Sequence, residues 1–269
     1  MTSKKNKKNK DFWTSNPMTY VDFKKPLKKR LPREKKHFDK INQKLISENP
    51  DFLNLIKQYK KHIKNKTILD LGCGFGSSSI ILSKFAKKIH AIDLTAPAVK
   101  YAKRNLKINK IKNVKLKQMD AENLNFKNNF FDFVFSWGVI HHSYKPEKIL
   151  RNIKNKLKLN GACFLMVYNF YSFRYIFLSL YYLFIRGYLL KGYNFTTICR
   201  KFTDGYYNKH YRSHEMVKIL NNIGFKNIKI SYGHHKGRIA PLIKSHDTWI
   251  GRFLSRHFGY FLYAYFEKK

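Results

Sequence analysis

The chain has 269 residues, of which 43% are hydrophobic and 16% aromatic, so it is apolar enough to form a large folded domain and is not disordered over most of its length. Lys and Arg number 55 against 16 Asp and Glu, a net charge of +39 that would attract phosphates, nucleic acid or anionic lipid. Lysine is abundant along the whole sequence, however, so compositional drift is favoured over a single basic patch. Charge alone therefore does not identify a partner.

The cysteines and apolar runs indicate where the protein resides. Cys73, Cys163 and Cys199 occur without a CxxC pair or a histidine cluster, so we expect no disulfide, no zinc or other metal site, and a reducing cytoplasm. Residues 1–10 are rich in Lys and Asn and lack the apolar stretch of a secretory signal. The most apolar run, at 175–185, is shorter than the roughly 20 residues that a spanning helix needs, so no transmembrane segment is predicted.

The first part of the chain is predicted to lie outside the main core. Residues 1–10 are expected to form a disordered tail, and residues 11–33 an irregular segment in which three prolines prevent a helix. Residues 34–62 have apolar side chains at helical spacing and predict two helices, which Pro50 separates.

Strands and helices then alternate. Short apolar runs predict strands at 67–71, 89–92, 114–119, 130–136 and 162–167. Helical patterns lie between them, and the last, which begins near Pro146, is expected to bury Leu157 and to end at Asn160 and Gly161. Such alternation predicts an α/β fold with a parallel, doubly wound sheet.

An aromatic-rich insertion interrupts this alternation at 169–212. After it, Ser213 is expected to cap a helix that ends at Gly224, and strands are predicted at 225–231 and 260–266. The insertion is favoured as a lid helix packed on the domain. It could instead form a hydrophobic acceptor pocket, or rest on a membrane surface with its flanking arginines outward.

Glycines and carboxylates follow the first three predicted strands. The run DLGCGFG at 70–76 has a GxGxG spacing that lets a ligand approach the backbone without a Cβ in the way. Asp93, at the tip of the second strand, could accept both hydroxyls of a ribose, or could be a charge at a helix N-terminus. Asp120, after the third strand, lies where an adenine amine would be, although a solvated loop acid is an equal alternative.

The motifs have a family's order and spacing. They are ILDLGCGFG at 68–76, AIDL at 91–94, DAENL at 120–124, FDFVFSWGVIHH at 131–142 and KLNG at 158–161. This set resembles the class I S-adenosylmethionine-dependent methyltransferases, and within them the small-molecule group related to the ubiquinone/menaquinone C-methyltransferases. The resemblance implies a Rossmann-like sheet of seven strands, mostly parallel with the last strand antiparallel, and helices on both faces.

The resemblance also implies S-adenosylmethionine as the cofactor and suggests how it would be held. Asp70 is expected to reach the methionine amino group and Asp93 to bind the ribose hydroxyls, while Asp120 and Ala121 bracket the adenine. The other expected cofactor-binding residues are Gly72, Cys73, Gly74, Leu94, Ser136 and Trp137. The chain is thereby divided into a tail with a helical extension, a cofactor-binding core, a helical lid and the rest of the core, at 1–63, 64–168, 169–212 and 213–269.

Catalytic candidates follow the fourth and fifth strands. Methyl transfer needs a base only when the acceptor is an alcohol, a phenol or an acidic carbon. His141 and His142 lie where an acceptor would sit, so one of them could take a proton, although a structural role for the pair is slightly favoured. Tyr168 poses the same choice. Cys73 is interpreted as a small packing residue and not as a nucleophile.

The expected function is methyl transfer in the cytoplasm to a small-molecule or lipid-like acceptor. An RNA methyltransferase or RNA-binding protein that uses the basic surface is the alternative, and a catalytically idle peripheral membrane protein is a third. The sequence SWGV at 136–139 replaces the NPPY-type turn of amino-directed nucleic-acid enzymes, which weakens the RNA interpretation. The segments at 12–18, and at 204–205 with 211–213, resemble parts of uncharacterised methyltransferases, without identifying an acceptor.

Overall fold

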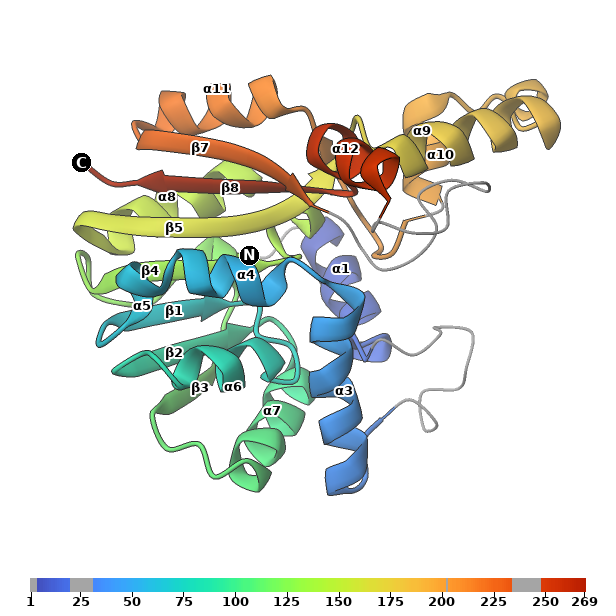
Figure 1. Ribbon diagram of the computed structural model, residues 1–269. Coiled ribbons are helices and arrows are strands. Elements are labelled where there is room, and N and C mark those ends of the chain that lie inside the picture. Colours follow the sequence, from blue (N-terminus) through green and yellow to red (C-terminus); the bar gives the residue numbers. More distant parts are fainter. Residues whose placement is uncertain (1–3, 20–30, 202, 234–247) are drawn as a thin grey trace.

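A single mixed sheet organises the protein. The computed structural model describes residues 4–19, 31–201, 203–233 and 248–269 (Figure 1). The strands along the sheet path run in the order β3-β2-β1-β4-β5-β8-β7, and β6 pairs with β5 beside this path. The strands are β1 Thr67–Leu71, β2 Lys88–Asp93, β3 Val114–Gln118, β4 Phe131–Trp137, β5 Leu157–Asn169, β6 His210–Tyr211, β7 Lys226–Gly233 and β8 Phe261–Glu267.

The sheet confirms the predicted mixture of strand directions. β1 to β5 are mutually parallel, whereas β8 runs antiparallel to both of its neighbours, β5 and β7. The two-residue strand β6 was not predicted, because a bridge this short has no pattern of its own and depends on the neighbouring β5.

Helices cover both faces of the sheet because its central strands are apolar on both sides. Val134 and Leu165 belong to one buried cluster, whereas their neighbours Phe133 and Phe164 belong to another, as expected where side chains alternate across a strand. The helices that pack on the second cluster are α4 Phe52–Gln58, α5 Lys60–Ile63 and α6 Ser77–Ser83. Those on the first are α8 Pro146–Lys156 and α11 Ser213–Ile223.

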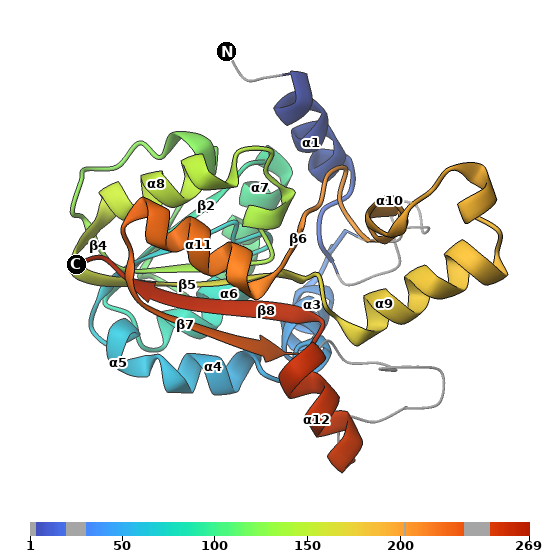
Figure 2. The same cartoon turned by 90° about the horizontal axis from the view of Figure 1, so that it is seen from above.

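The other helices lie along an edge or at one end of the sheet. Helix α7 Ala96–Ile108 contacts β2 and β3, and α3 Lys35–Glu48 contacts both α6 and α7. Figure 2 shows further elements gathered where β5 ends. They are α1 Lys4–Ser15, α9 Phe173–Leu180, the π-helical turn η3 Tyr181–Ile185, the 3-10 turn η4 Leu189–Lys191, α10 Phe195–Lys201 and α12 Trp249–Phe258.

The amino terminus differs from the predicted tail. Residues from Lys4 onward form helix α1, and Asn9 within it is 8% exposed. The side chain of Asn9 donates a 3.0 Å hydrogen bond to the carbonyl oxygen of His142. A helix of mostly polar residues is therefore held by a distant segment, which local composition does not reveal. Residues 20–30, part of the segment predicted to be irregular, lie outside the described residues.

Two helix boundaries were also predicted incorrectly. Helix α8 ends at Lys156, and Leu157 begins β5 because it pairs with Phe131 of β4. Asn160 has a φ of +60° at an irregularity in this pairing, so the Asn-Gly pair accommodates a bulge in a strand and does not end a helix. Arg212 occupies the N-cap position of α11, where no side chain makes a cap hydrogen bond, so Ser213 is the first residue of the helix.

No helix in the described part of the chain is long and apolar enough to cross a membrane.

Candidate active site

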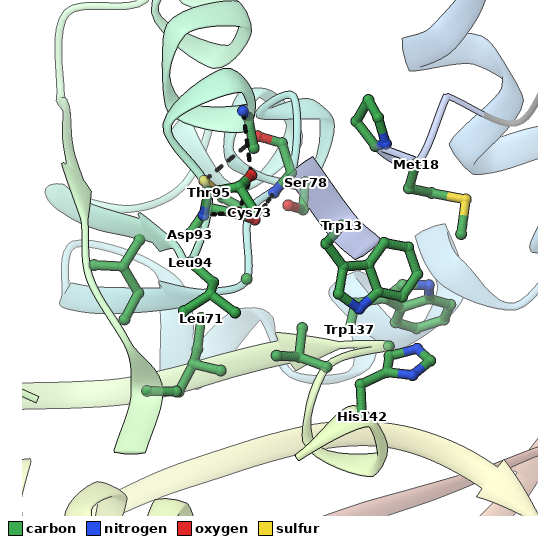
Figure 3. Close-up of a pocket in the computed structure, with 18 of the residues that line it drawn as sticks. Trp13, Met18, Leu71, Cys73, Ser78, Asp93, Leu94, Thr95, Trp137 and His142 are labelled. Atoms are coloured by element: carbon green, nitrogen blue, oxygen red, sulfur yellow. Dashed lines mark hydrogen bonds between the residues drawn. The ribbon is translucent and has the colours of Figure 1, made fainter. Parts of the chain in front are cut away.

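A cavity lies where the parallel strands end. Because β1 to β4 run in one direction, the residues at their carboxyl ends meet at the same edge of the sheet. The cavity has a volume of about 470 Å³, within the range of small-molecule sites in proteins. Figure 3 shows Asp93, Leu94 and Cys73 on one side of it and Trp13, Trp137 and His142 on the other.

The glycine turn forms the wall next to β1. The N–H groups of Gly72 and Cys73 both donate to the carbonyl oxygen of Ile92, which joins the turn to the end of β2. Gly74 has a φ of +53°, and a Cβ there would meet no atom within 4 Å, so its backbone faces open space. At Gly72 a Cβ would lie 2.1 Å from a methyl group of Val139, so close packing also requires glycine at this position.

Asp93 is held in a fixed orientation at the edge of the cavity. Its Oδ2 accepts a 3.0 Å hydrogen bond from the N–H of Gly74, and its Oδ1 accepts bonds of 2.9 and 3.0 Å from the N–H and hydroxyl of Thr95. Burial raises the pKa of Asp93, while the hydrogen bonds from Thr95 and Gly74 act in the opposite direction. A carboxylate has about four acceptor sites, and these bonds use both of those on Oδ1 and one on Oδ2. Oδ2 therefore retains capacity for a further donor, such as a hydroxyl of a sugar.

Most of the other expected cofactor-binding residues also line this cavity. Asp120 accepts a 2.8 Å hydrogen bond from the N–H of Glu122, which fixes the 3-10 turn η1 Ala121–Asn123 at the cavity wall. Burial raises the pKa of the Cys73 thiol well above its usual value, so it remains protonated and is no nucleophile at neutral pH. The expected residues among those that line the cavity are Gly72, Cys73, Gly74, Asp93, Leu94, Asp120, Ala121 and Trp137.

Asp70 and Ser136 are placed differently. Asp70 is 1% exposed, and its Oδ2 accepts hydrogen bonds of 2.7 and 2.5 Å from the hydroxyls of Ser78 and Ser79 on α6. Burial raises the pKa of Asp70 to about 6, against the effect of the two serine bonds. Ser136 is fully buried, and its hydroxyl has no hydrogen-bond partner within the described ranges. Neither residue is among those that line the cavity.

His142 is a catalytic candidate that lines the cavity, and of its two ring nitrogens only Nδ1 has a hydrogen-bond partner among the described residues. Its Nδ1 lies 2.8 Å from the carbonyl oxygen of Tyr207, which can only accept, so Nδ1 carries the proton and Nε2 has the lone pair. The ring of Trp13 packs edge-on against it, 4.8 Å away between centroids. Burial lowers the pKa of His142, although Asp204 partly opposes this, so the ring is neutral at pH 7.

His141 and Tyr168 have different surroundings. His141 is fully buried and is not among the cavity residues, and neither of its ring nitrogens has a partner in the part of the chain that is described. Its ring lies 3.9 Å from that of Tyr168. Tyr168 does line the cavity, where its hydroxyl donates to Oδ1 of Asp204. Burial and the charge of Asp204 raise the pKa of Tyr168, so this phenol keeps its proton.

Several cavity residues were not predicted as site residues. They come from α1 and the residues after it, from the end of the insertion and from the start of β8: Asn6, Asn9, Trp13, Pro17, Met18, Thr203, Asp204, Tyr260 and Phe261. Only the resemblances at 12–18 and 204–205 had singled out some of these positions. Their convergence depends on segments that are far apart in the chain.

Comparison with known proteins agrees with this geometry. Residues 62–175 match a family model described as a methyltransferase domain. The chain is 28% identical over 178 residues to phosphoethanolamine N-methyltransferase 2 of Caenorhabditis elegans, covering 66% of this chain and 36% of that protein. It is 28% identical over 138 residues to the ubiquinone biosynthesis O-methyltransferase of Pelagibacter ubique, covering 49% and 55%.

A solved structure extends the likeness to most of the fold. The chain resembles a SAM-dependent methyltransferase from Aquifex aeolicus with a TM-score of 0.56 and 16% identity, over 88% of this chain and all of that one. The chain thus spans only about a third to a half of the length of these curated relatives, whereas the match to the Aquifex aeolicus structure covers 88% of this chain. Fold, motifs and family match define a class I S-adenosylmethionine-dependent methyltransferase domain. Two solved structures of phosphoethanolamine N-methyltransferase 2 from Haemonchus contortus, each 21% identical with a TM-score of 0.53, are complexes with S-adenosylhomocysteine and S-adenosylmethionine.

Proposed function

We propose that the protein transfers a methyl group from S-adenosylmethionine to a small-molecule or lipid-like acceptor in the cytoplasm. The observation that carries the proposal is Asp93, oriented by Thr95 and Gly74 beside a backbone that faces open space. A bound S-adenosylmethionine supplies an electrophilic methyl group on a sulfonium. Asp93 would hold its ribose and Asp120 its adenine, while Gly74 lets the ligand approach the main chain.

The acceptor is proposed to bind at the aromatic end of the cavity. The side chains there are Trp13, Trp137, Tyr168 and Tyr260, with the carboxylate of Asp204 among them. Their packing excludes water from an acceptor and orients it, which is the main task of a protein in a direct displacement. The names of the relatives, a phosphoethanolamine and a ubiquinone-pathway methyltransferase, support an acceptor of small-molecule size.

His142 is the proposed base for an acceptor that must lose a proton. Its Nε2 lone pair is available because Tyr207 fixes the tautomer. Tyr168 keeps its proton, so its proposed role is to position the carboxylate of Asp204. The proposed role of His141 is to pack against the ring of Tyr168. The alternative RNA function rests on the net charge and on a likeness to the tRNA U34 carboxymethyltransferase of Campylobacter jejuni, which is 30% identical over 115 residues, or 42% of this chain and 38% of that protein.

Replacement of Asp93 tests the proposal. Asp93→Ala removes the carboxylate that would accept a ribose hydroxyl, so affinity for S-adenosylhomocysteine should fall on the order of ten- to a hundredfold. Isothermal titration calorimetry measures this affinity, and circular dichroism checks that the variant is folded. Asp39→Ala, on the outer surface of α3, is the matched control and should bind as wild type. If Asp93→Ala bound S-adenosylhomocysteine with unchanged affinity, the cofactor would not bind at this edge of the sheet.

A further inference from the structure

The insertion presents an unusual number of apolar side chains to solvent. Leu190 is 93% exposed, Ile185 74% and Phe184 63%. The other large exposed apolar residues here are Phe177 and Leu180 of α9, Tyr181 of η3 and Leu189 of η4. A contiguous patch of this kind on a folded domain indicates an interaction site, because isolated exposed apolar residues are ordinary but clusters are not.

Helix α12 adds a second group of exposed apolar residues at the same end of the molecule. They are Trp249, Ile250, Phe253 and Phe258. Figures 1 and 2 both show α9 and α12 extending from the end of the sheet at which β5 finishes and β8 begins. The bases of the two elements are in contact: Asn169, before α9, donates a 2.8 Å hydrogen bond to the carbonyl oxygen of Gly259, directly after α12. We call these two groups together the apolar surface.

The charges around the apolar surface are all of one sign. No Asp or Glu occurs between residues 169 and 203 or between residues 248 and 266. The exposed cations that flank the apolar surface are Arg186, Lys191, Arg200, Lys201 and Arg256. Exposed aromatic and aliphatic side chains bordered by Arg and Lys match an interface of anionic headgroups over acyl chains.

We propose that the apolar surface binds the face of an anionic lipid bilayer. The helices are too short to span it, so they lie in the headgroup region with their apolar side chains inserted. This placement brings the cavity to the membrane, since Thr203 and Asp204, at the end of the insertion, and Tyr260, next to α12, line the cavity as well. The inference concerns the surface and stands whether or not the enzyme reaction is the one proposed above.

Vesicle co-sedimentation tests the inference on the full chain. Wild-type protein should sediment with vesicles of phosphatidylglycerol and phosphatidylcholine, and clearly less with phosphatidylcholine alone. Ile185→Glu together with Leu190→Glu should weaken binding on the order of tenfold or more, because two inserted side chains become charged. The matched control is Leu159→Glu, at the opposite end of β5, which also replaces a 69% exposed leucine and should bind as wild type.

Three outcomes would overturn the assignment. Absence of binding to both kinds of vesicle would do so, and so would binding that Ile185→Glu with Leu190→Glu leaves unchanged, which would show attraction by charge alone. The third outcome is that light scattering shows the wild-type protein to be a dimer and the double variant to be a monomer, while neither protein binds vesicles. That result would assign the apolar surface to a second copy of the chain. Affinity for S-adenosylhomocysteine, measured in parallel, should be the same in all variants.

Discussion

The position of Asp70 in its motif does not reveal the direction in which its side chain points. Asp70 is the second-last residue of β1, close to the glycine turn, where the motif predicted contact with a ligand, yet its carboxyl group bonds to Ser78 and Ser79 of α6. The carboxyl therefore ties the strand to the first helix below the cavity. Its predicted contact with the methionine amino group stays a prediction, and the structure shows a structural role in addition.

The raised pKa of Asp70 predicts a dependence of stability on pH. The folded protein, in which this pKa is about 6, retains the proton over a range where an unfolded chain with a pKa of 3.8 has released it. The contribution of Asp70 to stability therefore falls as pH rises from about 4 to 6, and ionisation costs about 3 kcal/mol above that range. Asp70→Asn should lose this slope and be more stable at pH 7.5, by roughly 1–3 kcal/mol.

Urea unfolding of both proteins at pH 4.5, 6 and 7.5 measures the difference. Subtracting the variant from the wild type cancels the titration of all other groups. A difference that stays constant across this range would show that Asp70 titrates normally.

Gly205 makes room for His142. A Cβ at Gly205 would lie 2.5 Å from Nδ1 of His142, and the φ of +92° is one that side chains rarely adopt. Gly205→Ala should displace the ring and lower the rate of methyl transfer by about tenfold or more if His142 is the base. The readout is labelled-methyl transfer from S-adenosylmethionine into acceptors of a cell extract.

Gly192→Ala is the matched control for Gly205→Ala. Gly192 has a φ of +76°, but a Cβ there would meet nothing within 4 Å. Gly192→Ala therefore introduces similar backbone strain but no steric clash with His142, so the rate of methyl transfer by this variant should equal that of wild type. Equal rates in both variants would argue against His142 as a base.

At the scale of elements, α1 closes the cavity from outside the sheet. Asn9 bonds to the main chain of His142, and Trp13 packs on the ring of the same residue. Helix α1 therefore contacts the 3-10 turn η2 Ile140–His142, which follows β4, and contributes to the wall opposite Asp93 (Figure 3). The segment predicted to be a tail is thus part of the candidate site.

Removal of the Trp13 side chain should open this wall. We expect Trp13→Ala to weaken S-adenosylhomocysteine binding on the order of tenfold, because a large apolar contact at the cavity is lost. The melting temperature should change little, since Trp13 is only half-buried and lies outside the buried apolar clusters of the described residues. Trp249→Ala, whose side chain is 71% exposed on α12, is the control for loss of a tryptophan. Equal affinities in calorimetry would show that α1 does not close over the ligand.

At the scale of the whole molecule, the charge of +39 is spread over a sheet protein with few acids to neutralise it. Individual ion pairs exist, such as the 2.9 Å contact between Lys158 and Asp132, but lysines are abundant in nearly every segment. Repulsion among these lysines opposes the compact state, and salt screens the repulsion between charges that lie farther apart than the Debye length, about 10 Å at 0.1 M.

The melting temperature should therefore rise with ionic strength. Between 20 and 300 mM sodium chloride we expect the melting temperature to increase by several degrees. In a protein that is stabilised by surface ion pairs, the same salt would lower the melting temperature. Differential scanning calorimetry measures it, with sucrose in place of salt to separate osmotic effects. A flat or falling melting temperature would mean that the lysines are already compensated.

The central sheet could be predicted from the sequence because its information is local. Strands β1, β2 and β4 are apolar runs buried on both faces, and each ends at a glycine or carboxylate that marks the edge of the sheet. The same locality revealed Asp93, Asp120 and the glycine turn, which lie at strand ends. Side-chain direction was less predictable, as Asp70 and Ser136 show, because a shift of one residue reverses the face.

The sequence by itself determined the sheet, the edge of the sheet at which the cavity lies and the class of protein, since those depend on short motifs in fixed order. Tertiary structure alone decided that α1 is a helix over the cavity, that His142 and not His141 reaches it, and that Asp204 joins Tyr168 there. These features are contacts between segments more than 30 residues apart, up to 133 residues for Asn9 and His142. These contacts are stabilised by residues that lie far apart in the chain, so local composition and periodicity do not reveal them.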